Sequence, residues 1–274
     1  MIGAIIGDII GSNYEYKNNK TKDIELFSPN SVITDDSILT FAVFEALEEA
    51  KGDYKDLNKR TAKKLLKWVN RYPNPGGGYG VSFYYWAMDG ILLGKPLPPY
   101  NSYGNGSAMR VSPVAYFASS LDECILLSKK VTEVTHNHPE GIKGAEAVAV
   151  AIYLALEGES KEAIQTHMKT HYYDLNQTLD EIRPTYRFDE TCQNTVPQSL
   201  QAFFESTSFE DAIRNAISLG GDADTIGAIT GAIAGAYYGV DDVFREFIFE
   251  KIDEYQIDVL MKMMAYAKKR HHIA

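Results

Sequence analysis

Two rows of glycines constrain the fold of this chain more than any other feature. Spaced every fourth residue, they comprise Gly3, Gly7 and Gly11 near the start of the sequence, and Gly227, Gly231, Gly235 and Gly239 near its end. Glycine costs about 1 kcal/mol per site in a helix, so such a row needs a packing reason. Small residues at this spacing form a ridge along which two helix backbones can approach closely. We expect two central helices in close contact; the alternative is that any glycine-rich helix shows this pattern.

Helical periodicity extends through most of the chain. Apolar residues at three-to-four spacing predict helices over residues 39–50, 57–69, 121–135, 144–156, 163–171, 196–205, 209–219, 225–238, 243–252 and 257–269. Convincing alternating strands are missing, and no Gly/Ser linker or composition shift divides the sequence. We therefore expect an all-α fold in a single domain spanning residues 1–274.

The composition and charge limit where the protein can act and which partners it can bind. A net charge of −10 argues against passive attraction to a nucleic-acid backbone or an anionic membrane. Cys124 and Cys192 make neither a disulfide framework nor a metal-binding pair. The apolar run 2–10 lacks a basic flank and is interrupted by Asp8, and no uncharged apolar stretch reaches the ~18–20 residues of a membrane helix. We expect a monomeric, cytoplasmic protein without membrane or generic nucleic-acid partners.

Two short acidic motifs lie far apart in the sequence. They are Thr34-Asp35-Asp36 and, after two glycines, Asp222-Ala223-Asp224-Thr225, each followed by an apolar run. Asp and Thr are good residues at helix starts, so two unrelated helix caps are one interpretation. Capping needs one oxygen, however, and each motif offers three.

A metal site is the other interpretation of the acidic motifs. Four carboxylates brought together would repel one another at neutral pH, and divalent cations relieve that repulsion. The ligands are all oxygen, which favours Mg²⁺, Mn²⁺ or Ca²⁺ over structural Zn²⁺. His136 and His138 could suggest zinc, but a third ligand would have to come from His167, His171, His271 or His272.

A third feature is the glycine-rich stretch 102–110. A glycine-rich turn that opens a helix presents backbone N–H groups to an anion. This one lacks the Gly-Lys-Ser/Thr ending of a P-loop and the preceding strand of a Rossmann turn. Taken alone, it is weak evidence for a binding site.

Together, these motifs resemble the ADP-ribosylglycohydrolase family, which includes dinitrogenase-reductase-activating glycohydrolases and ADP-ribosyl-acceptor hydrolases. The matching segments follow the family's order: Gly7 to Glu15, Thr34-Asp35-Asp36-Ser37, Ser102 to Arg110, Thr135-His136 with His138-Pro139-Glu140-Gly141, and Gly220 to Gly227. The loop 72–79 departs from the commoner pattern in carrying three consecutive glycines, and no role is carried onto it.

The resemblance implies an orthogonal helical bundle with two divalent cations, Mg²⁺ or Mn²⁺, at the base of a cleft. The implied metal ligands are Thr34, Asp35, Asp36, Asp222, Asp224 and Thr225. The implied ADP-ribose contacts are His136 and the loop Ser102, Tyr103, Gly104, Asn105, Gly106 and Ser107, which would hold the diphosphate with Tyr103 near adenine. Glu15 matches an acidic residue beside the metals that can close over the site.

The implied reaction is hydrolysis of the C1″ bond of ADP-ribose attached to a macromolecule, with ADP-ribose as a product. Such cleavage has oxocarbenium-like character, and Glu15, Asp35 or Asp36 could take or relay a proton from water. ADP-ribosyl-arginine on protein is the expected substrate. The alternatives are ADP-ribosyl-serine, a modified nucleic-acid base, O-acetyl-ADP-ribose, or binding without catalysis. Asp189-Glu190 could be a second acid/base pair, although a helix cap is the preferred interpretation.

Overall fold

The two glycine rows meet at the centre of the molecule. In the computed structural model, which describes residues 1–271, helix α1 (Ile2–Ser12) lies against α12 (Ala223–Tyr237). A Cβ atom added at Gly3 would stand 2.1 Å from the Gly231 carbonyl oxygen, and one at Gly7 would stand 1.9 Å from that of Gly227. These distances leave no room for a side chain, so the predicted close contact is confirmed.

The order of the contacts shows that α1 and α12 are antiparallel. Gly3 meets Gly231, Gly7 meets Gly227, and Gly11 meets Ala223 at the start of α12. The C-terminal end of α1 therefore lies beside the N-terminal end of α12. Two segments about two hundred residues apart in the sequence are brought together at this point, which becomes the floor of the site.

The fold is all-α, as predicted. The remaining helices are α2 (Asp35–Ala50), α3 (Leu57–Arg71), α4 (Val81–Leu92), α5 (Pro113–Phe117), α6 (Leu121–Thr132), α7 (Pro139–Leu156), α8 (Lys161–His171), α9 (Leu179–Ile182), α10 (Cys192–Phe204), α11 (Phe209–Ile217), α13 (Asp242–Phe249) and α14 (Glu254–His271), with a 3₁₀ turn η1 (Asn105–Ser107). Residues 1–271 contain no β-strand; they form two isolated bridges, Thr34 with Gly76 and Gly104 with Thr191.

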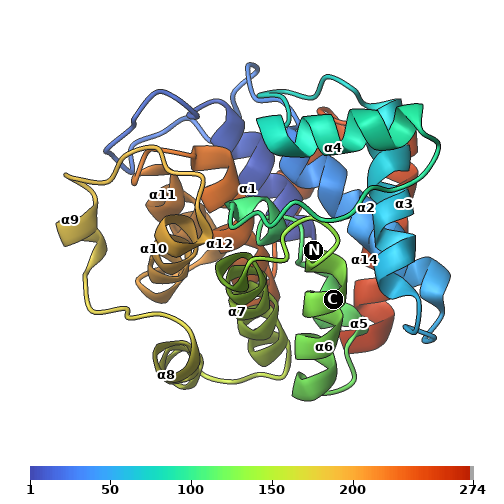
Figure 1. Cartoon of the computed structure of the whole chain (residues 1–274). Coiled ribbons are helices and arrows are strands. Elements are labelled where there is room, and N and C mark those ends of the chain that lie inside the picture. The colour runs from blue at the N-terminus through green and yellow to red at the C-terminus, as the bar shows by residue number, and fades with distance from the viewer. Residues whose placement is uncertain (272–274) are drawn as a thin grey trace.

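The helices cross one another around the α1–α12 pair. Figure 1 shows this pair in the middle of the molecule, with α8 and α9 at its periphery. The core is continuous from α1, whose Ile5, Ile6, Ile9 and Ile10 are fully buried, through α2, α7 and α12. None of the helices within residues 1–271 is both long enough and apolar enough to cross a bilayer.

All ten helices predicted from periodicity are present, with ends that shift by a few residues. Helix α1 was expected from its glycine row, and α4, α5 and α9 were indicated by neither pattern. The last two are too short for a period to show. In α4, exposed apolar residues such as Val81, Tyr85 and Leu92 hide the buried face formed by Phe83 and Trp86.

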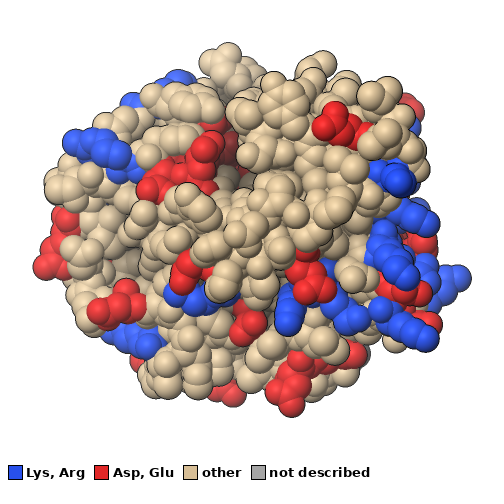
Figure 2. Space-filling model, in the orientation of Figure 1, with Lys and Arg blue, Asp and Glu red and all other residues tan. Residues whose placement is uncertain are grey.

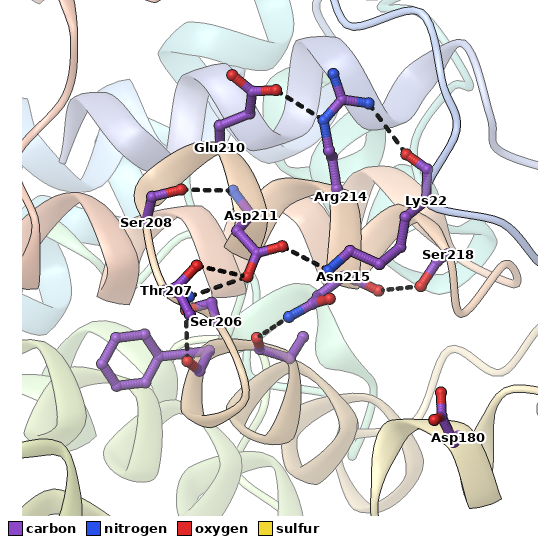
Figure 3. Close-up of polar contacts among 12 residues, drawn as sticks. Lys22, Asp180, Ser206, Thr207, Ser208, Glu210, Asp211, Arg214, Asn215 and Ser218 are labelled. Atoms are coloured by element: carbon purple, nitrogen blue, oxygen red, sulfur yellow. Dashed lines mark hydrogen bonds and ion pairs between the residues drawn. The ribbon is translucent and has the colours of Figure 1, made fainter.

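The connection from α1 to α2 is fastened to α11. Figure 3 shows the Arg214 guanidinium donating to the Lys22 carbonyl, at 3.0 Å, while the Lys22 ammonium pairs with Asp211. Arg214 also donates to the Ile24 carbonyl, and Lys20 reaches the carbonyls of Tyr186 and Leu219. These contacts hold the second half of the connection in place. The first half contains Glu15, which lines the cavity described below.

Candidate active site

A cavity of about 480 Å³ opens where the starts of α2 and α12 meet the end of α1. Its wall includes Glu15, Asp35, Asp36, Asp222, Asp224, Thr225, Ser102, Gly104, Asn105, Gly106 and His136 among the residues expected at the site. Figure 2 shows a hollow in this face of the molecule with acidic side chains gathered at its edge. The sequence motifs are therefore brought to one place.

The first acidic motif is held by α1. Thr34 caps α2, and its hydroxyl accepts a hydrogen bond from the Asp36 N–H. That hydroxyl donates to Asp8 Oδ1 at 2.6 Å, so one oxygen lone pair of Thr34 remains free after the bond from the Asp36 N–H. Asp8 also accepts bonds from the backbone N–H groups of Thr34 and Ser37 and from the Ser37 hydroxyl. A fully buried carboxylate thus positions the start of α2.

The second acidic motif meets the first across the α1–α12 contact. Thr225 donates from its hydroxyl to Asp36 Oδ2 at 3.3 Å, which joins the starts of α12 and α2. Glu15, Asp222 and Asp224 each offer a carboxylate oxygen, and these oxygens lie within 4.8 Å of one another. Two unrelated helix caps would not converge in this way.

Burial and mutual repulsion make these carboxyl groups hard to ionise. Burial, followed by neighbouring aspartates, raises the pKa of Asp35, Asp36 and Asp224 well above their usual range. Burial also raises the pKa of Glu15, with Asp222 and Glu190 adding to it. In each case burial of the carboxyl group is the largest cause, and neighbouring carboxylates add to it.

The residues present fit divalent cations. Asp36 Oδ1 is buried and has no hydrogen-bond partner among the described residues, although it is a carboxylate oxygen. Such an orphaned atom is expected where a ligand supplies the missing partner. The carboxylates of Glu15, Asp222 and Asp224, together with Asp36 and the Thr225 hydroxyl, offer oxygen ligands, the type preferred by hard cations.

The loop 102–107 joins the acidic cluster to the cavity wall. The Asn105 side-chain amide donates to Asp222 Oδ2 at 2.6 Å, and its backbone N–H donates to the Glu190 carbonyl. The Gly104 N–H is taken by the Ser102 hydroxyl. These two backbone donors are therefore engaged, and Gly106 remains on the wall as the position where the backbone can face an anion.

Three expected site residues do not line the cavity. Thr34 lies behind it against Asp8, as described above. Ser107 is buried and donates to the Gly141 carbonyl at 2.9 Å. Tyr103 is 48% exposed, with its ring 5.3 Å from that of His138. Tyr103 therefore does not line the cavity, although it was expected to stack near adenine.

His136 and His138 play different parts in the structure. His136 lines the cavity, whereas Nδ1 of His138 accepts a bond from the Glu140 N–H and caps α7. His167 and His171 lie on α8, with their ring centroids 4.5 Å apart. The His271 side chain and His272 lie outside the described residues. Nothing in the described part brings a third ligand to a zinc site at His136 and His138.

Several cavity residues were not predicted. Gly77 and Gly78 adopt φ angles of 70° and 82°, and the Thr34–Gly76 bridge holds their loop over the acidic cluster. The three consecutive glycines were the available signal, because left-handed backbone favours glycine. Tyr16 and Phe188 stack at the cavity mouth with ring centroids 5.3 Å apart.

The pair Asp189-Glu190 divides its roles. Asp189 Oδ1 accepts from the N–H and hydroxyl of Thr191, which is itself the N-cap of α10, so neither Asp189 nor Glu190 is the expected helix cap. Glu190 instead lines the cavity, and burial together with Asp222 raises its pKa. Sequence spacing could not separate these neighbours.

Comparison with known proteins agrees with the geometry. The family model for ADP-ribosylglycohydrolase matches residues 1–271. The chain is 27% identical to ADP-ribosylhydrolase ARH3 of Homo sapiens, covering 89% of this chain and 85% of the relative. It is 26% identical to ADP-ribosylarginine hydrolase Tri1 of Pseudomonas putida (92% and 72% covered), and 27% identical to ADP-ribosyl-[dinitrogen reductase] glycohydrolase of Rhodospirillum rubrum (88% and 85% covered).

Structural comparison supports the fold. A solved structure described as an ADP-ribosylglycohydrolase-related protein complex matches with a TM-score of 0.70 at 23% identity, covering 99% of this chain and 96% of that one. The expected orthogonal bundle is thereby confirmed. Because the family model spans nearly the whole sequence, the chain belongs to the ADP-ribosylglycohydrolase family and is an ADP-ribosylhydrolase, an enzyme that acts on glycosidic bonds.

Proposed function

We propose that the chain hydrolyses the C1″ bond of ADP-ribose attached to an arginine side chain on a protein, in a cation-dependent reaction. The observation that carries this proposal is the convergence of Glu15, Asp36, Asp222 and Asp224 on one cavity. Relatives named for ADP-ribosylarginine and for ADP-ribosylated dinitrogen reductase support the choice of acceptor. The acidic mouth favours a cationic guanidinium leaving group over a neutral one.

The proposed cation ligands are Asp35, Asp36, Asp222, Asp224 and Thr225, which line the cavity, and Thr34, which lies behind it against Asp8. Two Mg²⁺ or Mn²⁺ ions bound there would neutralise the carboxylates and act as Lewis acids toward hydroxyl groups and water. Asp8 supports Thr34 from behind the cavity, and Asn105, on the cavity wall, donates to Asp222.

Glu15 is the proposed proton acceptor. It is half-buried, its carboxylate lies beside Asp222 and Asp224, and a Cβ atom at Gly77 would stand 3.0 Å from its Oε2. A carboxyl group whose pKa is raised by its surroundings is suited to proton transfer near neutral pH. Neither Lys17 nor Lys22 forms an ion pair with Glu15, since they contact Asn13 and Asp211.

A panel of defined substrates tests the proposed acceptor. Purified protein would be offered ADP-ribosyl-arginine peptide, ADP-ribosyl-serine peptide, ADP-ribosylated DNA and O-acetyl-ADP-ribose at equal concentration. We expect ADP-ribose release to be fastest from the arginine peptide, and Glu15→Gln to lower kcat by about 10²-fold or more. A faster reaction with any other member would replace arginine as the acceptor. Binding without turnover on every member would contradict the proposed reaction.

A further inference from the structure

Arg110 is a buried cation without a carboxylate partner. Its side chain is 1% exposed, lies against the Phe83 ring, and forms no ion pair within residues 1–271. Its Nη2 donates to the Thr135 hydroxyl at 2.6 Å. A guanidinium has only donors, so this bond has one possible direction. The hydroxyl oxygen of Thr135 is the acceptor of this bond, so the hydroxyl proton of Thr135 needs an acceptor of its own.

That proton has one available acceptor. Thr135 is fully buried, and the other partner of its hydroxyl among the described residues is Nδ1 of His136, at 2.8 Å. Leaving a buried hydroxyl proton unpaired costs roughly 1–3 kcal/mol. The hydroxyl of Thr135 therefore donates to Nδ1 of His136.

An accepting Nδ1 places the proton of a neutral imidazole on Nε2. His136 is 4% exposed and lines the cavity. Burial, with Arg110 adding to it, holds the pKa of His136 well below its usual range, so the ring is neutral. A second proton, on Nδ1, would also face the Thr135 oxygen, which already accepts a hydrogen bond from the Arg110 guanidinium.

Nε2 faces the glycine-rich loop. A Cβ atom added at Gly106 would stand 3.3 Å from Nε2, and one at Gly104 would stand 3.7 Å from it. No described residue accepts a hydrogen bond from Nε2. The donor is thus directed at the part of the cavity wall where the backbone of Gly106 also faces inward.

We propose that Arg110 and Thr135 are positioning residues that hold His136 as the Nε2–H tautomer, so that it donates a hydrogen bond to an oxygen of the substrate diphosphate. The identity of the acceptor oxygen rests on the proposed function, whereas the tautomer does not. In this role His136 is a fixed donor and takes no proton during the reaction.

The tautomer is tested by ¹⁵N NMR of histidine-labelled, ligand-free protein, with His136→Gln to assign the signals. We expect His136 to carry its proton on Nε2, and its Nδ1 shift to move in Thr135→Val toward that of a nitrogen without a hydrogen bond. Thr135→Ser should keep the wild-type shift, because it keeps the hydroxyl. His138 is an internal control: its Nδ1 accepts from Glu140, and its signals should not move. A proton on Nδ1, or an unchanged Nδ1 shift in Thr135→Val, would overturn the proposed chain of hydrogen bonds from Arg110 through Thr135 to His136.

Calorimetry with ADP-ribose tests the diphosphate contact. Losing one well-placed donor corresponds to about a tenfold weaker affinity in Thr135→Val, with Thr135→Ser within about twofold of wild type. If wild type, Thr135→Val and Thr135→Ser bound ADP-ribose equally while the NMR result was as expected, the tautomer would stand and the contact of His136 with the diphosphate would be excluded. If wild-type protein did not bind ADP-ribose, the proposed function would fail, and the NMR result would still decide whether Arg110 and Thr135 set the tautomer of His136.

Discussion

Oδ1 of Asp8, on α1, lies 2.6 Å from Oγ1 of Thr34, the residue that caps α2. Through this contact the first central helix sets the position of the first acidic motif. Asp8 receives four donated hydrogen bonds in all, from Thr34 and Ser37. An amide in its place could accept on one oxygen only and would present N–H groups to donors.

Burial raises the pKa of Asp8 to about 6, which by itself would favour a neutral group, but the amide leaves buried donors unpaired. We therefore expect Asp8→Asn to destabilise the protein and to weaken cation binding, although Asp8 does not line the cavity. Unpaired buried donors correspond to roughly 1–3 kcal/mol in the free energy of unfolding, measured by denaturant titration. Asp242→Asn is the matched control, since Asp242 forms an exposed pair with Arg245 that should contribute little. Equal stability of the two variants would argue against a positioning role for Asp8.

The α1–α12 contact predicts a large difference between two glycine-to-alanine changes. In Gly7→Ala the new methyl would meet the Gly227 backbone at 1.9 Å, so the helices must separate, at a cost of about 1–3 kcal/mol or more. Gly80→Ala is the control, because nothing lies within 4 Å of its Cβ position and its φ is −53°. Thermal unfolding should show a lower Tm for Gly7→Ala and a much smaller change for Gly80→Ala, which alters only the N-cap of α4. A wild-type Tm for Gly7→Ala would refute the close approach.

Asp224→Asn should abolish turnover and yet raise the stability of the cation-free protein. Burial and neighbouring aspartates raise the pKa of Asp224 in the folded state above its unfolded value. A raised carboxyl pKa contributes stability at low pH that is lost as pH rises, so the ionised group opposes folding at neutral pH. The neutral amide removes that opposition. Tm measured with chelator at pH 7.5 should therefore be higher than for wild type.

Asp211→Asn gives the opposite sign and is the control for Asp224→Asn. Although burial raises the pKa of Asp211, hydrogen bonds from Lys22 and Thr207 lower it overall. Its ionised form thus stabilises the fold at neutral pH (Figure 3), and its replacement should lower Tm. Both variants shifting Tm in the same direction would contradict the electrostatic account of the acidic cluster.

His136 predicts a loss of stability in mild acid. Its folded pKa lies well below its usual value because of burial and Arg110, so the unfolded chain takes up a proton that the folded chain does not. Stability must then fall as pH drops through the ordinary histidine range near pH ~6.5. We expect the difference in unfolding free energy between pH 7.5 and pH 5.5 to be smaller in His136→Gln than in wild type. An unchanged or larger difference would mean that His136 is charged in the fold.

Local periodicity predicted ten of the helices, whereas the convergence of the acidic motifs was expected from their shared chemistry and from the glycine rows. Glycine spacing in α1 and α12 predicted their contact, which places the end of α1, shortly before Glu15, beside the start of α12. The role of Asp8 could not be predicted, since an aspartate in an apolar run gives no sign of its partners on another helix. The position of Tyr103 depends on the packing of its loop against α7 through His138, which spacing does not determine.

The central claim is cation-dependent hydrolysis at the cavity formed by α1, α2 and α12. It is tested most directly by following ADP-ribose release from an ADP-ribosyl-arginine peptide with chelator-treated protein, while Mg²⁺ or Mn²⁺ is restored. The account predicts no release without the cation, saturable recovery as it is added, and no recovery in Asp36→Asn. Release that is indifferent to chelator, or full recovery in Asp36→Asn, would contradict it.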